Sequence, residues 1–168
     1  LSGERIKIWP HANLSGQGNL DSRILDRLPD VKTLVSIVSP PFAKSDSCRA
    51  AIEAFYRAAH QAGDWTVDSK ARLFKVVKTP VDLQDLPEPL SGLFQQLLSF
   101  DFFELDAQTG KLREFSEEFG EAARRQFLEK IYDLAFEINQ VIRSLKTRQS
   151  KGRAAAARGP LTPTSRPR

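Results

Sequence analysis

The run KTLVSIVSPPFAKSDSCRAAIEAF, residues 32–55, decides the fold. Its first part, 32–39, is apolar almost throughout, which is typical of a central parallel strand covered on both faces. Ser45 is a good helix N-cap, and Cys48, Ile52, Phe55, Ala59 and Ala62 follow at helical spacing. The stretch therefore predicts a buried strand followed directly by a helix.

The rest of the chain repeats this alternation. Further strands are predicted at 5–9, 72–78 and 100–105, helices at 19–29 and from Ser116 onward, loops at 10–18 and 64–69, and an irregular connection at 79–90. A turn around Thr109-Gly110 leads to a short return strand. The pattern predicts an α/β domain of flavodoxin-like type, with a mostly parallel sheet flanked by helices and a long C-terminal helix.

Apolar residues recur along the predicted C-terminal helix at spacings of three and four. The main stripe comprises Phe119, Ala123, Phe127, Ile131, Leu134, Ile138, Val141 and Leu145, and a parallel stripe adds Leu128, Ala135 and Ile142. Such a stripe is wider than a coiled-coil seam, so it favours packing of the helix on its own sheet.

Charge divides the chain into two parts. Residues 146–168 carry seven of the 25 basic residues and no acidic ones, whereas residues 1–145 hold 18 basic against 21 acidic groups. We expect 1–145 to form the folded domain and 146–168 to be a basic, disordered tail. The net charge of +4 therefore belongs to the tail, and nucleic-acid binding by the domain is not expected.

Composition further limits the classes of protein. No apolar run is long enough to cross a bilayer, and the first ten residues do not resemble a signal peptide, which predicts a cytoplasmic protein without a membrane partner. One cysteine and two histidines predict neither a disulfide nor a metal site. Cys48 with His11 or His60 as base could form a nucleophilic pair, but its place in an apolar stripe favours a core side chain.

Three segments together resemble bacterial Toll/interleukin-1 receptor (TIR) domains. The run VSIVSPPFAKSDSCRAAIEAF resembles the third strand and third helix of that family. RIKIWPHANLSGQGNLDSRIL is similar to its second strand, its BB loop and the following helix. LFKVVKTPV and FFELDAQTGKLREF resemble the later strands, so that the resemblance covers about 5–145.

The resemblance implies a signalling and assembly module that acts through homotypic TIR–TIR contacts or self-association. Its BB loop would supply the interaction residues, which are Leu14, Ser15, Gly16, Gln17 and Gly18. As an alternative, the resemblance implies an NAD⁺ hydrolase (NAD nucleosidase) of the bacterial type, in anti-phage or stress signalling. NAD would then be a substrate or ligand, and no cofactor is required; the expected NAD-contacting residues are Trp9, Ser39, Ser45 and Cys48.

The expected catalytic position departs from the family pattern. In the family, a glutamate stands three residues after the cysteine and stabilises the positive charge that develops as nicotinamide leaves. Here that position is Ala51, and Glu53 lies two residues further, about 200° around the helix. Glu53 is therefore the candidate catalytic acid only if the helix is shifted in register, and enzymatic activity stays open.

Other positions leave further alternatives. The tryptophan often found before the cysteine is Ser47, and the second strand ends in Trp9-Pro10-His11 rather than in a charged residue. Ser39 and Ser45 are either phosphate-binding groups at a strand-to-helix turn or simple turn and cap residues. The family's first strand and helix have no counterpart here, which leads us to expect an N-terminally incomplete domain.

Overall fold

The computed structural model describes residues 7–8 and 26–157. Within them the elements follow in the order η1 (Leu28–Asp30), β1 (Leu34–Val38), α2 (Pro40–Ala43), α3 (Asp46–Gln61), β2 (Thr66–Val67), β3 (Lys70–Ala71), β4 (Leu73–Val77), η2 (Leu83–Asp85), α4 (Leu90–Gln96), β5 (Ser99–Asp101), β6 (Phe103–Leu105), β7 (Leu112–Glu114), η3 (Glu117–Phe119) and α5 (Glu121–Ala157). The η elements are short 3-10 helices.

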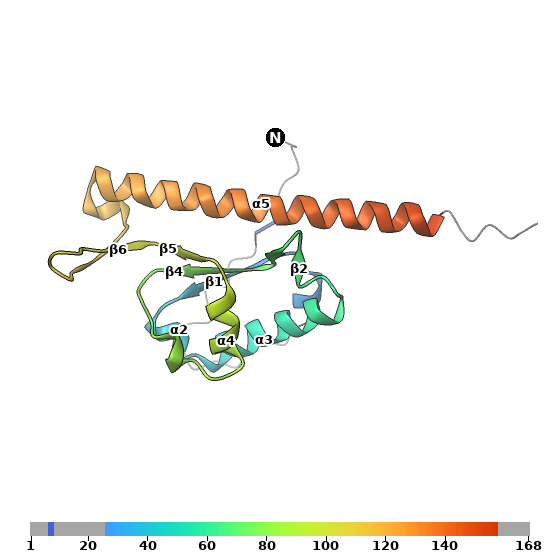
Figure 1. Ribbon diagram of the computed structural model, residues 1–168, viewed down its shortest axis with the longest axis horizontal. Helices are drawn as coiled ribbons and strands as arrows, with labels where there is room; N and C mark the ends of the chain where they lie inside the picture. The colour runs from blue at the N-terminus through green and yellow to red at the C-terminus, as the bar shows by residue number, and fades with distance from the viewer. Residues whose placement is uncertain (1–6, 9–25, 158–168) are drawn as a thin grey trace, which may run out of the picture.

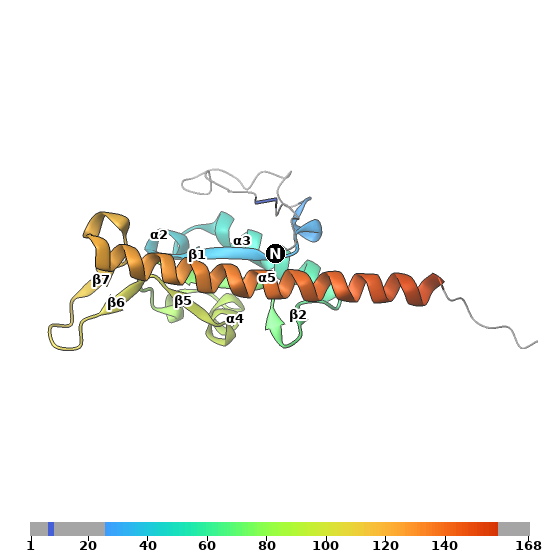
Figure 2. The same ribbon diagram turned by 90° about the horizontal axis from the view of Figure 1, so that it is seen from above.

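Three parallel strands form the central sheet, in the order β1-β4-β5. Helices α2, α3 and α4 lie on one side of it, and α5 crosses the other side (Figures 1 and 2). The α/β prediction, with a parallel sheet flanked by helices and a long C-terminal helix, is confirmed. The helix capped by Ser45 is also confirmed, as α3. The strand predicted at 32–39 is present as β1, but the prediction that it is central and covered on both faces is wrong. In the described part of the chain β1 lies at the edge of the sheet, and its Val35 and Ile37 are exposed.

Alternate residues of each strand serve two separate cores. The larger core lies between the sheet and helices α3 and α4, and contains Leu28, Val38, Phe42, Ala51, Ile52, Phe55, Leu73, Leu86, Leu90, Phe94 and Leu97. The smaller core lies beneath α5 and contains Val67, Phe74, Val76, Phe100, Phe102, Val141 and Leu145. Strand β4 is covered on both faces, which explains why it is apolar except for Lys75.

Arg72 joins the start of the sheet to the end of α3. Its Nε donates to the carbonyl oxygen of Lys32 at 2.7 Å, its other nitrogens bond Asp64 and the carbonyl of Val31, and its guanidinium lies 5.3 Å from the centre of the Phe55 ring. The Arg72 side chain is only 7% exposed. A buried guanidinium with its donors paired in this way has a structural role, holding these segments together.

The prediction of a single strand at 100–105 is wrong, because this segment forms two strands, β5 and β6. Phe102 lies between β5 and β6; its N–H bonds Val77 of β4, and its carbonyl accepts from Phe115. The chain therefore leaves the parallel sheet at this residue and pairs antiparallel with β7. The predicted turn at Thr109-Gly110 is confirmed, with Gly110 at φ +66°, a conformation that favours glycine.

Smaller corrections concern the loops and the N-terminal region. Of the strand predicted at 5–9, the structure describes Lys7 and Ile8, which are not in a strand. Of the helix predicted at 19–29, it describes 26–29, a turn that leads into η1, where proline at the start favours a 3-10 turn. The predicted 64–69 loop contains β2, which forms a hairpin with β3 through Asp68 and Ser69, both at positive φ. Helix α4 was not predicted from the sequence.

The C-terminal helix is longer than the sequence predicts and begins later. Ser116 caps η3 rather than α5, with Glu118 N–H donating to its hydroxyl at 3.3 Å, and Gly120 at φ +93° separates the two. At the other end α5 continues to Ala157, so the predicted disordered tail is helical over 146–157. Alanine, lysine and arginine are good helix formers, and this propensity outweighs the lack of packing there.

Candidate functional site

The carboxyl end of β1 brings together three of the predicted ligand-contacting residues. Ser39 precedes α2, and its carbonyl accepts from the N–H of Ala43. Ser45 is the N-cap of α3, its hydroxyl accepting from Cys48 N–H at 3.3 Å. Cys48 is half-buried and packs against the larger core. These contacts give Ser45 and Cys48 structural roles, as a cap residue and a core-facing side chain.

Ala51 and Glu53 lie on different sides of α3. Ala51 is 7% exposed and belongs to the larger core, together with Ile52 and Phe55. Glu53 is half-buried and lies about 200° further around the helix, away from those core side chains. The backbone therefore keeps the register expected from Ser45, without the shift that would bring Glu53 to the position of Ala51.

The remaining predicted site residues lie outside the described part of the chain. These are Trp9, the candidate NAD contact, and the candidate interaction residues Leu14, Ser15, Gly16, Gln17 and Gly18. Their predicted roles stay predictions. Among residues 7–8 and 26–157, no group of three or more histidine, cysteine, aspartate or glutamate side chains could hold a metal ion. No helix in the same ranges is long and apolar enough to cross a membrane.

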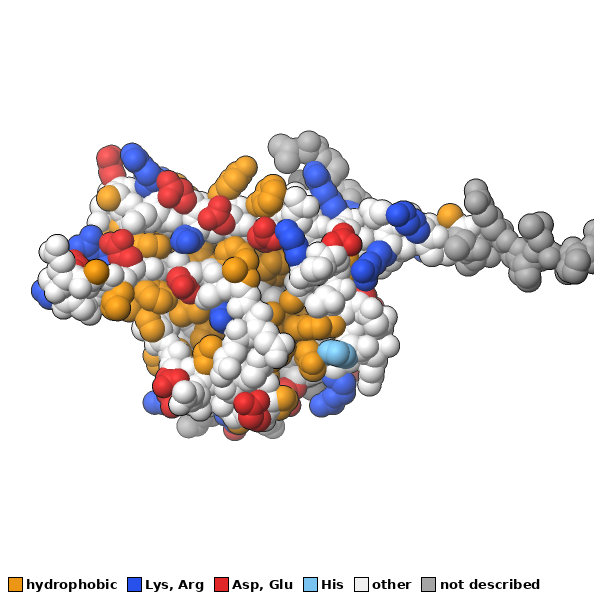
Figure 3. All heavy atoms as spheres, in the orientation of Figure 1, with side chains coloured by type: hydrophobic (Ala, Val, Ile, Leu, Met, Phe, Trp, Pro, Cys, Tyr) orange, Lys and Arg blue, Asp and Glu red, His pale blue; other side chains and the backbone are white. Residues whose placement is uncertain are grey.

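A polar flank of α5 faces β3 and β6. Gln126 donates to Glu104 of β6 at 3.3 Å, and Glu137 pairs with Lys70 of β3 at 2.6 Å. The view in Figure 3 shows charged side chains along α5 and hydrophobic ones gathered below it, over the sheet. These two contacts fix the rotation of α5 on the sheet, and the flank on the opposite side of the helix therefore faces β1.

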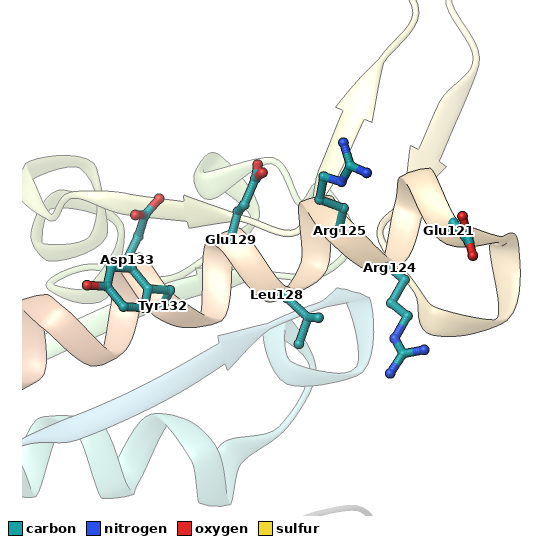
Figure 4. A pocket seen from close by; sticks show the side chains of 7 residues that line it. All are labelled: Glu121, Arg124, Arg125, Leu128, Glu129, Tyr132 and Asp133. Carbon is teal, nitrogen blue, oxygen red and sulfur yellow. The ribbon is translucent and has the colours of Figure 1, made fainter.

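The flank of α5 that faces β1 is apolar and exposed. Leu128 is 48% exposed and Ile131 42% exposed, although both belong to stripes that the sequence assigned to packing on the sheet. Figure 4 shows Leu128 projecting toward β1, in a shallow depression lined by α5 alone. The lining residues are Glu121, Arg124, Arg125, Leu128, Glu129, Tyr132 and Asp133.

Strand β1 continues this apolar surface. Val35 and Ile37 lie on the α5 face of the sheet, in register with Phe74 and Val76 of β4. Phe74 and Val76 are buried under α5, whereas Val35 is 39% and Ile37 60% exposed, because α5 does not extend over β1. We call Val35, Ile37, Leu128 and Ile131 the β1–α5 surface.

The β1–α5 surface extends over the outer side of the helix. Tyr132 is 73% exposed and Phe136 52% exposed, and both lie more than 90° around α5 from the buried Val141. Exposed hydrophobic residues are ordinary when scattered, but a contiguous apolar patch on a folded domain marks an interaction site. The sequence does not distinguish these exposed residues from the buried ones. The apolar stripe shows which residues of the helix are hydrophobic, but not how much of the helix the sheet covers.

A second feature that the sequence did not predict is an aromatic cluster near the end of α3. The rings of Tyr56 and Trp65 lie 4.7 Å apart and those of Tyr56 and His60 lie 4.5 Å apart, and His60 stacks on Trp65 at 6.2 Å. Trp65 also packs against the larger core. The cluster covers the end of the helix and connects it to β2.

A row of polar side chains is buried beneath the sheet. Ser36, Lys75 and Ser99 are direct neighbours in register on β1, β4 and β5, and Ser36 and Lys75 are 6% and 7% exposed. Lys75 Nζ donates to the carbonyl of Phe94 at 2.8 Å. Burial lowers the pKa of Lys75, and the negative charge of Asp101 opposes this effect in part. Among the described residues, the Ser36 hydroxyl has no hydrogen-bond partner.

Because of Lys75, the free energy of unfolding should change with pH in the alkaline range. Between its lowered folded-state pKa and the usual value of 10.5, the unfolded chain keeps a proton on Lys75 that the folded chain has released. The free energy of unfolding of the wild type, relative to Lys75→Met, should therefore rise with pH across that window. Urea denaturation of both proteins from about pH 7 upward measures the difference, and two parallel curves would contradict the assignment.

The chain matches no protein-family model, and neither a curated protein nor a solved structure matches it.

Proposed function

We propose that this chain is a protein-assembly module that associates with further copies of itself. The observation that carries the proposal is the β1–α5 surface, where four large apolar side chains from a strand and a helix lie exposed on one side of the domain. Burying them against a partner removes apolar area from water, at roughly 25 cal/mol per Å². Homotypic assembly is also the function that the resemblance to TIR domains implies.

The charged residues of α5 support an association that is apolar in its centre and charged at its rim. Along α5, Leu128 and Tyr132 follow Arg124 and Arg125 and are accompanied by Glu129 and Asp133, with Glu121 one turn before the basic pair. Two copies of such a helix surface that face each other antiparallel would place Arg124 and Arg125 of each toward Glu129 and Asp133 of the other. Charge complementarity of this kind favours self-recognition over association with unrelated surfaces.

NAD cleavage is not part of the proposal. The position of the family's glutamate is filled by Ala51, which packs in the core, and Glu53 lies on the other side of α3. Trp9 and the 14–18 segment, which would complete the expected cleft, lie outside the described residues. No observation of the described site favours the enzyme over the assembly module.

Sedimentation velocity tests the proposal. Over a concentration range of about 1 to 100 µM, the weight-average sedimentation coefficient of the full chain should rise with concentration, as expected for a Kd of micromolar order. Leu128→Asp should shift the transition to higher concentration by about tenfold, because a charge replaces an apolar group at the centre of the surface. Raising the ionic strength should leave most of the association intact, because its centre is apolar.

The matched control is Leu98→Asp, which changes a residue that is 68% exposed and lies outside the β1–α5 surface. It should associate as the wild type does. A wild-type chain that stays monomeric over the whole concentration range would refute the proposed function. An equal effect of both variants would remove the β1–α5 surface from it.

A further inference from the structure

Strand β1 has an open edge in the described part of the chain. The N–H of Leu34 donates to the backbone carbonyl of Arg72, and the carbonyl of Val38 accepts from the backbone N–H of Lys78. The backbone groups of Leu34, Ser36 and Val38 are therefore directed to β4. The N–H and C=O groups of Val35 and Ile37 therefore point away from the sheet. Exposed edges are usually protected by charge, proline or a bulge, and the sequence of β1, LVSIV, contains neither charge nor proline.

The sequence of β1 is nearly symmetric about its centre. On one side of Ser36 come Val35 and Leu34, and on the other Ile37 and Val38, so that in each direction a β-branched residue is followed by an apolar one. If two copies pair antiparallel about Ser36, Val35 of each lies opposite Ile37 of the other. These pairs exchange both backbone hydrogen bonds, so that all the outward-pointing groups of Val35 and Ile37 find partners.

Ser36 lies on the two-fold axis of such a pairing. Its hydroxyl is buried and has no partner among residues 7–8 and 26–157 of the same chain. In an antiparallel pair, residues of a non-hydrogen-bonded position have Cα atoms about 4.5 Å apart, and serine hydroxyls at such positions can bond each other. Such a bond requires each Ser36 side chain to turn about its Cα–Cβ bond toward the axis.

We propose that two copies of this chain pair β1 with β1, antiparallel about Ser36, and join their sheets into one of six strands. The proposal rests on the proposed self-association and specifies its geometry. The interface is isologous, since each copy contributes the same strand. Because the two-fold axis is perpendicular to the sheet, both α5 helices lie on one face, and their apolar flanks face each other across Val35 and Ile37 of both copies.

Ile37→Lys tests the pairing in the full chain. Ile37 is 60% exposed, so the substitution should leave the fold intact. In the dimer it enters the interface twice, and we expect the dimer Kd to rise by about a hundredfold, about tenfold at each position. Leu98→Lys, with a comparable exposure beside the other edge strand, is the control and should leave the Kd unchanged.

Disulfide trapping provides a second measurement that does not depend on weakening the dimer. In a Cys48→Ser background, Ser36→Cys should form a covalent dimer on mild oxidation, because its Cα distance across the axis is short enough for a disulfide. Ser99→Cys, on the opposite edge strand β5, should not.

The outcomes separate the two proposals. Dissociation by Ile37→Lys together with trapping through Ser36→Cys would support the β1 pairing. A chain that self-associates but keeps its Kd in Ile37→Lys, or does not trap through Ser36→Cys, would overturn the pairing and leave the assembly function standing. A wild-type chain that is monomeric at every concentration would overturn both.

Discussion

Replacing Arg72 with alanine should lower the free energy of unfolding by about 3–5 kcal/mol, the loss expected when one partner of a buried ion pair is removed. Its guanidinium joins the carbonyls of Val31 and Lys32 to Asp64, so the substitution leaves three acceptors without their donor. The contact with the Phe55 ring is lost as well. Urea denaturation followed by far-UV circular dichroism measures the change.

Arg113→Ala is the matched control for Arg72→Ala. Arg113 also pairs with a carboxylate, that of Glu104 at 3.3 Å, but its side chain is 66% exposed. An exposed ion pair contributes about 0–1 kcal/mol, so this variant should be close to the wild type. If the two arginine variants lost the same stability, the structural role assigned to Arg72 would be wrong.

Introducing glutamate at position 51 should destabilise the protein by roughly 3 kcal/mol or more, because it places a carboxylate in the larger core. Ala51 is 7% exposed and belongs to the core cluster on α3. Desolvation of the carboxylate and overpacking of the core both oppose the change. Thermal unfolding and urea denaturation should both show the loss.

Glu53→Ala is the control for Ala51→Glu. It lies on the same helix and replaces glutamate with alanine instead of alanine with glutamate. Glu53 lies away from the core, and its removal should alter stability by less than about 1 kcal/mol. An Ala51→Glu variant as stable as the wild type would mean that the side chain at position 51 reaches solvent. The position would then be accessible to a ligand, and nicotinamide release from NAD would become the next measurement.

The parts of the fold that the sequence predicts well are those where local pattern and tertiary environment agree. Strand β1 places Val38 in the larger core, and α3 begins after its cap residue Ser45; the apolar run and the cap make both elements visible in the sequence. The break at Phe102 is not visible in the sequence. Its apolar neighbours on both sides read as one strand, and the break depends on a bond to Val77 in another strand.

The candidate site is predicted less well than the fold. The sequence shows that Leu128 and Ile131 are apolar and periodic, but their exposure depends on how far α5 reaches across the sheet. The burial of Lys75 likewise depends on the neighbouring strands, because a lysine in an apolar run reads as an exposed position. Both are properties of the assembled layers, which no local window of sequence contains.

The extension of α5 beyond the sheet has a consequence for how the domain unfolds. The helix is continuous to Ala157, yet among its side chains described up to residue 154 the last buried one is Leu145. After that point an exposed hydrogen bond still joins Arg148 to the carbonyl of Thr66 at 3.4 Å, so it is the described residues beyond Arg148 that should open independently, with little free-energy cost. Their amides should exchange with deuterium far faster than those near Val141. The cooperative folding unit therefore ends inside an unbroken helix, well before the helix reaches Ala157.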